Sequence, residues 1–365
     1  MNLPDDFGLG AVETLSHVAT TDRAACHVAF WSTWNEVVFS RMPRLVRRSE
    51  PDPSDATAAV EFESTDHVRI GCRLFGPPEG TPVRAGLVAS HGYRPPPPLA
   101  EESKRWEPIV QRGVAVLAIR LRGYPGSQLD VGNLTGKDEG WITHGLGSSG
   151  PEGEAHGGGD WIVSGAVADV VNACRALRRD LGGRGGGVPA VPIYLHGRSL
   201  GGGLAIVAAS QLAGRDDVQR VVVALPSLGD WPWRLDHPTH AGIGAHVHAL
   251  LRTAPDRVDA IVTTLRLFDA AVHARRVRCP LLCKLAVRDD VVPAPCAAAV
   301  YNAIGTDPAL KWRWVVAFGH FEGGIAAARR HALFDRLVAD FLDPAMPPRQ
   351  AMQDWNADLS PRLPG

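Results

Sequence analysis

The sequence lacks the features that mark several classes of protein. No apolar run approaches the roughly 20 residues that a helix needs to cross a bilayer, so we expect no membrane-spanning segment. Neither sign of charge is in excess, because 38 lysines and arginines stand against 39 aspartates and glutamates. A long basic run is also missing, and we therefore expect neither a nucleic-acid nor a membrane partner.

Cysteine is sparse as well. Six cysteines in 365 residues do not make a disulfide framework. Cys279 and Cys283 are spaced C-x3-C, but no further ligand pairs accompany them, so buried thiols are expected rather than a zinc site. The stretch from Met1 to Asp6 has no basic start followed by apolar residues. We therefore expect no signal peptide and a cytoplasmic location.

The chain does contain short apolar runs that alternate with helical stretches. This alternation is typical of a mostly parallel sheet with helices on both faces. Two alternating runs, 58–64 and 68–75, come first and predict an antiparallel pair. Six buried strands are expected to follow, at 86–90, 114–119, 191–196, 220–225, 281–286 and 312–318. Eight strands in this order match the sheet of the α/β-hydrolase fold.

The predicted hydrolase domain covers residues 58–345. It follows an N-terminal arm, 1–57, that we expect to be helical around 24–39, and it precedes a C-terminal tail, 346–365. Two stretches are additions to the minimal fold: a glycine-rich excursion after the fourth strand, 120–160, and a helical insertion before the seventh strand, 227–278. Such additions at the carboxyl ends of parallel strands are where ligands bind.

A candidate nucleophile lies between the fifth strand and the next helix. Residues 197–201 read Gly-Arg-Ser-Leu-Gly, a G-x-S-x-G pattern. In this context the turn is sharp, and its glycines let neighbouring backbone approach while Ser199 projects at the edge of the sheet. The alternative is an ordinary glycine-rich turn whose serine caps the helix.

A serine hydroxyl needs a base and an orienting acid, and the fold places them after the seventh and eighth strands. Asp289 and His320 occur at those two positions. Asp290 competes for the role of the acid, but the bend toward Pro293 favours Asp289. The rival histidines His273 and His331 fall in helical stretches and are expected at the surface.

Two backbone N–H groups should form the oxyanion hole. We predict the amide of Leu200, directly after the nucleophile, and the amide of Tyr93, in the His-Gly-Tyr segment after the third strand. The segment 156–159, His-Gly-Gly-Gly, looks like the oxyanion motif of lipases, but it lies in the excursion and is interpreted as a loop.

This chemistry needs no metal and no organic cofactor, and none is predicted. Four histidines between 237 and 248 suggest a metal site, but no carboxylates or cysteines accompany them at metal-binding spacing. They are better explained as part of a partly exposed helical insertion.

Taken together, these residues resemble the acetyl xylan esterase and cephalosporin C deacetylase family. The segments that carry the resemblance are 30–31, 91–93, 122–127, 140–145, 197–204, 264–270, 289–293 and 301–302. The resemblance implies removal of acetyl groups from small molecules, such as short xylo-oligosaccharides and acetylated cephalosporins. It also implies a cytoplasmic protein and often a hexameric ring, so a homo-oligomer is expected. It supports Ser199, Asp289, His320 and the Tyr93 amide in the roles above.

The sequence departs from the family pattern near the pocket. Tyr124 and Pro125 replace the Gln and Gly of the R-G-Q-G-x-S segment, and Arg120 stands where the family has Asp. The Glu usually adjacent to the catalytic His lies one place further on, as Glu322. None of these changes removes a catalytic group, but they alter the surroundings of the pocket.

We therefore predict a serine esterase acting on short acyl esters of small molecules. An acyltransferase or a peptidase on the same fold would use the same acyl-enzyme. A peptidase of the oligopeptidase type usually carries a large accessory domain, which this chain lacks. A non-catalytic binding protein would typically have lost one of the residues predicted above.

Overall fold

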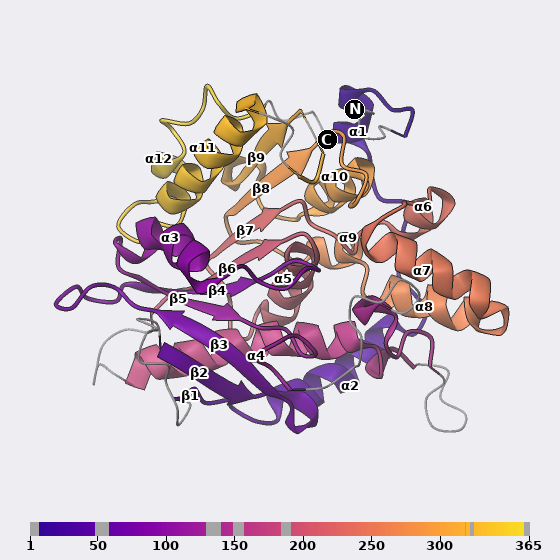
Figure 1. Ribbon diagram of the computed structural model, residues 1–365, viewed down its shortest axis with the longest axis horizontal. Coiled ribbons are helices and arrows are strands. Elements are labelled where there is room, and N and C mark those ends of the chain that lie inside the picture. Colours follow the sequence, from indigo (N-terminus) through magenta and orange to yellow (C-terminus); the bar gives the residue numbers. More distant parts are fainter. Residues whose placement is uncertain are drawn as a thin grey trace.

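The structure is a computed structural model, and it describes residues 7–47, 58–128, 140–148, 157–183, 191–317, 319–321 and 325–360. Within these ranges nine strands form one mixed sheet, in the spatial order β1-β2-β3-β5-β4-β6-β7-β8-β9 (Figure 1). The part of the chain that the structure describes contains no helix long and apolar enough to cross a membrane.

All eight predicted strands are present, with ends shifted by at most two residues. They are β2 (Ala58–Glu63), β3 (Arg69–Phe75), β4 (Ala85–Ser90), β5 (Val114–Ile119), β6 (Ile193–Arg198), β7 (Arg220–Ala224), β8 (Leu281–Ala286) and β9 (Lys311–Val316). The predicted count of eight is one too few, because β1 (Val46–Arg47) pairs antiparallel with β2. Both residues of β1 are exposed, so they lack the apolar pattern that reveals a strand.

The sheet is parallel from β5 across to β9, whereas β3 runs antiparallel to both of its neighbours. Strand β4 pairs with both β5 and β6, and Ser90 aligns with Gly197 in that pairing. The segments that follow β4 and β6 therefore leave the sheet side by side. This register brings the predicted oxyanion loop next to the predicted nucleophile.

Two helical layers cover the sheet. Helices α4 (Ile162–Gly183) and α5 (Leu200–Leu212) pack on one face, and α3 (Leu99–Val110) and α11 (Ile325–Phe341) pack on the other (Figure 1). Alternate residues of β5 bury on opposite faces, as the two-residue period of a strand requires. Apolar residues on both sides of the sheet thus make two cores.

The N-terminal arm contributes to one of these cores. It contains α1 (Ala11–Ser16) and α2 (His27–Phe39), the helix expected around 24–39. The indole Nε1 of Trp31 donates to the carbonyl oxygen of Leu267 at 3.0 Å, and that of Trp34 donates to Oγ of Ser164 in α4 at 3.0 Å. Both tryptophans are buried. The arm is therefore an integral layer of the molecule.

The insertion before β8 is helical, as predicted. It contains α6 (Trp231–Asp236), α7 (Gly242–Thr253), α8 (Val258–Leu267) and α9 (Ala270–Ala274). Helices α6 to α8 lie on the side toward which the parallel strands point (Figure 1). The remaining helices are α10 (Ala294–Ala303) after β8 and α12 (Pro348–Ala351) near the end of the chain.

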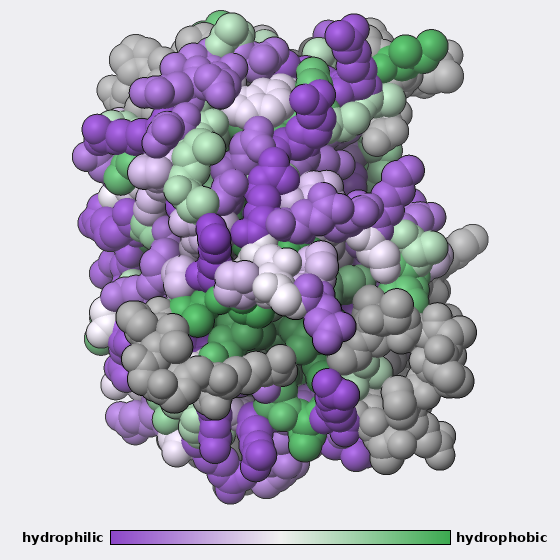
Figure 2. All heavy atoms as spheres, turned by 90° about the vertical axis from the view of Figure 1, so that its left-hand side faces the viewer, coloured by the Kyte–Doolittle hydropathy of each residue, from purple (hydrophilic) through white to green (hydrophobic). Residues whose placement is uncertain are grey.

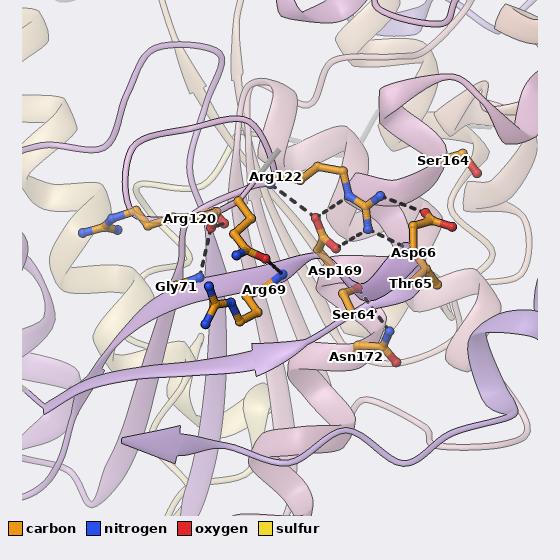
Figure 3. Close-up of polar contacts among 12 residues, drawn as sticks. Ser64, Thr65, Asp66, Arg69, Gly71, Arg120, Arg122, Ser164, Asp169 and Asn172 are labelled. Carbon is orange, nitrogen blue, oxygen red and sulfur yellow. Dashed lines mark hydrogen bonds and ion pairs between the residues drawn. The ribbon is translucent and has the colours of Figure 1, made fainter. Parts of the chain in front are cut away.

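The segment after β5 is fixed by the guanidinium of Arg122 (Figure 3). Its Nε and Nη2 donate to the two carboxylate oxygens of Asp169, in α4, at 3.0 and 2.8 Å, and its Nη2 also donates to Oγ1 of Thr65 at 2.9 Å. This bidentate pairing is the geometry in which an arginine and a carboxylate interact most strongly. The carbonyl of Arg122 accepts from Nε1 of Trp141 at 2.8 Å. These bonds fix Trp141 beside the segment that follows β5.

The end of the molecule at which the parallel strands begin is mostly hydrophilic (Figure 2). Apolar side chains gather there in one hollow. The candidate site lies at the other end, beyond the carboxyl ends of the strands.

Candidate active site

Ser199 occupies a strained turn between β6 and α5. Its φ and ψ are 55° and −118°, a conformation that residues with a side chain rarely adopt. A Cβ at Gly197 would collide with the carbonyl group of Gly201, so only glycine fits there. Such strain costs on the order of 1–3 kcal/mol and persists only where the surrounding structure imposes it. Here the Ser199 carbonyl accepts from the amides of Gly202 and Ser227, at 2.9 and 3.1 Å.

Asp289 and His320 are in direct contact. Oδ2 of Asp289 lies 2.8 Å from Nδ1 of His320, while its Oδ1 accepts from the amides of Val291 and Val292 at 3.0 and 2.9 Å. The carboxylate is therefore fixed by the turn after β8, and it holds the proton of the imidazole on Nδ1. Nε2 is then the ring nitrogen that can accept a proton.

The structure separates the two candidate carboxylates. Asp289 is buried and bonded to His320, whereas Asp290 is exposed. The structure thus places Asp289, and not Asp290, against His320.

The predicted oxyanion residues flank Ser199. Leu200 is the first residue of α5. Tyr93 follows Gly92, where an added Cβ would lie 3.5 Å from Cβ of Ser199. The loop after β4 therefore runs beside the nucleophile. Oη of Tyr124 donates to the carbonyl oxygen of Tyr93 at 2.6 Å, which fixes the peptide that follows Tyr93.

The side chain of Tyr93 makes contacts that the sequence did not reveal. Its hydroxyl accepts from the amide of Ile142 at 3.3 Å and is hydrogen-bonded to Nδ1 of His246, in α7, at 2.8 Å. Burial raises the pKa of Tyr93 to about 12 and lowers that of His246, so both groups are neutral at pH 7. Three separate segments meet at this hydroxyl. Two of these segments, 91–93 and 140–145, carry the family resemblance, and that resemblance was the sequence signal that could have pointed to this contact.

His91 also supports the loop. Its Nδ1 donates to the carbonyl oxygen of Gly92 at 2.7 Å, and its Nε2 accepts from the amide of Leu121 at 3.1 Å. Burial, which outweighs the other influences, lowers the pKa of His91 to about 4. The imidazole is therefore neutral and keeps one donor and one acceptor in place.

These groups share one cavity of about 960 Å³. Ser199, His320, Tyr93 and His246 line it, together with residues of α3 and α11. Its size lies in the range of pockets that enclose small-molecule ligands. A small ester can therefore reach Ser199 and His320 at the same time.

The rival histidines are buried, so their expected surface positions are wrong. His273 bonds to Oγ of Ser210 and to the carbonyl oxygen of Leu267, both at 2.9 Å, and packs against Trp31. His331 lies on the inner side of α11, against Lys284. Helical period alone did not predict these two burials, because a pair of arginines lies close to each histidine, at 275–276 and 329–330.

Several other sequence features take no part in the cavity. Gly157–Gly159 form a short 3₁₀ turn, with Gly158 close to Phe30 of the arm, whereas His156 lies outside the described residues. All six cysteines are free thiols. Among the residues that the structure describes, no group of three or more His, Cys, Asp or Glu is placed to hold a metal ion.

Comparison with known proteins gives a family match over part of the chain and a fold over most of it. The acetyl xylan esterase (AXE1) family model matches residues 187–333, a stretch that includes Ser199, Asp289 and His320. No curated protein matches the chain significantly in sequence.

Solved structures match over most of the chain. Acetyl xylan esterase 1 from Thermoanaerobacterium sp. JW/SL YS485 has 20% identity and a TM-score of 0.68, covering 91% of this chain and 99% of that one. Acetyl xylan esterase from Paenibacillus sp. R4 has 18% identity and a TM-score of 0.69, covering 90% and 99%. Acylaminoacyl peptidase from Pyrococcus horikoshii, at 14% identity and a TM-score of 0.53, covers 85% of this chain but only 43% of its own. The fold is that of the α/β-hydrolases, and residues 187–333 are similar to the acetyl xylan esterase family.

Proposed function

We propose that this protein is a serine esterase that hydrolyses short-chain acyl esters, above all acetyl esters, of small molecules such as acetylated oligosaccharides. The observation that carries the proposal is the buried Asp289–His320 pair, which lines one cavity with Ser199 at its strained turn. The family match over the same residues supports the acetyl ester as substrate. Catalysis in a cytoplasmic homo-oligomer, expected from the sequence, completes the proposal.

In this mechanism, Nε2 of His320 takes the proton of the Ser199 hydroxyl as its Oγ attacks the ester carbonyl. Asp289 keeps the other ring proton on Nδ1 and stabilises the imidazolium that forms. His320 then gives its proton to the leaving alcohol, which leaves an acyl-enzyme on Ser199. Water, activated by His320, attacks this ester and releases the acid.

The amides of Tyr93 and Leu200 donate to the oxyanion that develops in both steps. Loss of one such donor typically lowers turnover by about 100- to 1,000-fold. The bond from Tyr124 to the Tyr93 carbonyl holds this peptide segment beside Ser199, so the donor is oriented before substrate arrives. The positive end of α5 adds to the field at the same place.

The test is the hydrolysis of 4-nitrophenyl esters from acetate to octanoate by the wild type and by Ser199→Ala. We expect acetate to give the highest kcat/KM and Ser199→Ala to lose almost all turnover. If octanoate is hydrolysed faster than acetate, the preference for short acyl groups is wrong. If the wild type shows no turnover above buffer, the whole proposal fails.

The acyl acceptor is tested separately. With methanol added at increasing concentration, a hydrolase continues to release acetate, whereas an acyltransferase forms methyl acetate in preference. A dominant methyl acetate product at low methanol would assign the protein to the acyltransferases.

A further inference from the structure

A buried arginine of the insertion lies between two of the turns that build the active site. Arg234, in α6, is fully buried, with an exposed fraction of 0%. Its guanidinium packs over the ring of Trp231, with Cζ 5.1 Å from the ring centroid. Arg234 does not line the cavity that contains Ser199 and His320. Any effect of this arginine on catalysis must therefore act through its neighbours.

Two hydrogen bonds connect the guanidinium of Arg234 to these turns. Its Nη2 donates to the carbonyl oxygen of Val291 at 3.1 Å, and its Nη1 donates to Oγ of Ser227 at 3.3 Å. The amide of Val291 in turn donates to Oδ1 of Asp289 at 3.0 Å. The amide of Ser227 donates to the carbonyl oxygen of Ser199 at 3.1 Å. One guanidinium therefore joins the turn of the acid to the turn that supports the nucleophile.

This guanidinium is poorly compensated for a buried cation. Arginine stays protonated in proteins and carries five N–H donors, of which the bonds above use two. Nε is buried and has no hydrogen-bond partner, and no carboxylate among the residues that the structure describes forms an ion pair with the side chain. Removing a cation from water costs free energy that a partner normally offsets. Arg234 therefore weakens the fold, and its presence calls for another explanation.

The charge of Arg234 acts on Asp289. Burial lowers the pKa of Arg234, while Cys296 and Asp289 oppose this shift. Burial also raises the pKa of the Cys296 thiol well above its usual value, so this thiol is neutral. Asp230, directly before α6, bonds instead to His17 of the N-terminal arm at 2.7 Å. Attraction between opposite charges is mutual, so the arginine stabilises the ionised carboxylate of Asp289.

We propose that Arg234 is a positioning residue of the active site: it holds the turn that bears Asp289 against the turn that supports Ser199, and its positive charge favours the ionised form of Asp289. This inference rests on the proposed esterase function. An ionised Asp289 keeps a proton on Nδ1 of His320, which leaves Nε2 free to take the proton of the nucleophile. The insertion thereby contributes to the reaction from outside the cavity.

Arg234→Met tests the role, because it removes the charge and both hydrogen bonds while an apolar side chain still fills the space. We expect kcat for 4-nitrophenyl acetate to fall by about 10- to 100-fold, the effect of a small displacement of catalytic groups, and KM to change little. Tm should stay the same or rise, because an apolar side chain in place of a buried, poorly paired charge is often neutral or stabilising. Arg252→Met, at an exposed cation of α7, is the matched control and should change neither quantity.

The pH profile of kcat/KM separates the charge of Arg234 from its hydrogen bonds. Without the cation, the imidazolium of His320 forms more easily, so the acid limb of Arg234→Met should move to higher pH by about half a unit. Arg234→Lys keeps the charge but loses the planar fork, so its limb should match wild type while kcat falls. The other titratable groups around the arginine are Asp230, Cys296 and His248, and both variants leave them in place.

Gly244, in α7, provides a variant that keeps the arginine itself. A Cβ there would lie 2.9 Å from Nε of Arg234 and 2.6 Å from Oγ1 of Thr239, so Gly244→Ala crowds the guanidinium out of its place. We expect kcat to fall by about 3- to 10-fold, because the two turns lose their common donor. This variant decides the question if Arg234→Met does not fold.

Two results would overturn the inference. One is a kcat within about twofold of wild type in Arg234→Met, or in Gly244→Ala where the first variant does not fold. The other is an acid limb that stays in place in Arg234→Met, since a purely structural arginine would leave it unchanged. Wild-type hydrolysis that depends on Ser199 would still leave the proposed esterase function standing, so the two failures are distinguishable.

Discussion

The hydroxyl of Tyr93 lies 2.8 Å from Nδ1 of His246, so the loop beside the nucleophile is joined directly to the inserted helix α7. The two residues are 153 positions apart in the sequence. Because Tyr93 also supplies a proposed oxyanion donor, the position of the insertion and the geometry of the oxyanion hole are coupled through one side chain.

This coupling can be measured with a double-mutant cycle. Tyr93→Phe keeps the backbone amide and removes the hydroxyl, and His246→Ala removes its partner. We expect each variant to lower kcat/KM for 4-nitrophenyl acetate by about 3- to 10-fold, with a coupling energy near 1 kcal/mol. His248→Ala, on the same helix, should behave like wild type. Fully additive effects would show that the hydrogen bond does not position the loop.

The two neighbouring carboxylates after β8 give a matched pair of variants. Asp289→Asn keeps the shape of the side chain but removes the charge that fixes the tautomer of His320, so kcat should fall by about 10,000-fold. Asp290→Asn, at the exposed neighbouring position, should stay within about twofold of wild type. Equal losses in the two variants, measured with 4-nitrophenyl acetate, would argue against Asp289 as the orienting acid.

Gly140 provides a steric test of the same region. Its φ of −92° suits any residue, but a Cβ there would collide with the His246 ring and the Tyr93 hydroxyl. Gly140→Ala should therefore lower both kcat/KM and Tm, with an overpacking cost of about 1–3 kcal/mol. Gly159→Ala serves as the control because its added Cβ meets nothing within 4 Å. An active, stable Gly140→Ala protein would contradict the close approach of the three segments.

Stability should depend on pH through the buried histidines. Burial, together with the charges of neighbouring basic groups, lowers the pKa of His273 to about 3 in the folded protein, against about 6.5 in the unfolded chain. Between these values only the unfolded chain binds the proton. The free energy of unfolding should therefore fall as pH drops below 6.5, by about 1.4 kcal/mol per pH unit for this one group.

The measurement is urea unfolding between pH 6.5 and 4.5 for the wild type and His273→Gln. The variant should be less stable at every pH but should show a smaller loss on acidification. Burial raises the pKa of Asp269 to about 6, so protonation of Asp269 stabilises the folded protein as pH falls. Because the two proteins differ only at His273, the difference between their slopes reports the titration of His273. Identical slopes for the two proteins would show that His273 does not titrate as described.

The strands could be predicted because each is a short apolar run that alternates with a helix. β8 was predicted to the residue, since all six of its side chains are buried. β1 could not be found, because its two residues are exposed and depend on pairing with β2. A pattern confined to neighbouring residues in the sequence cannot reveal such a long-range pairing.

The candidate site likewise has residues that the sequence could predict and contacts that it could not. Ser199, Asp289 and His320 were predicted because each follows a strand at a position that the fold prescribes. The partners of Tyr93 were not, because His246 lies in an insertion whose orientation no local pattern encodes. The contact between Lys284 and His331 was missed for a related reason: each looks ordinary in sequence, and the packing of α11 on β8 brings them together.

The buried tryptophans of the arm have a consequence for synthesis of the chain. Trp31 leaves the ribosome well before its indole partner, the carbonyl of Leu267, which is 236 residues further along. Until that residue emerges, the indole of Trp31 lacks this partner and stays open to other nascent chains or to a chaperone. During synthesis, Trp31 should therefore reach its final place only after Leu267 has emerged.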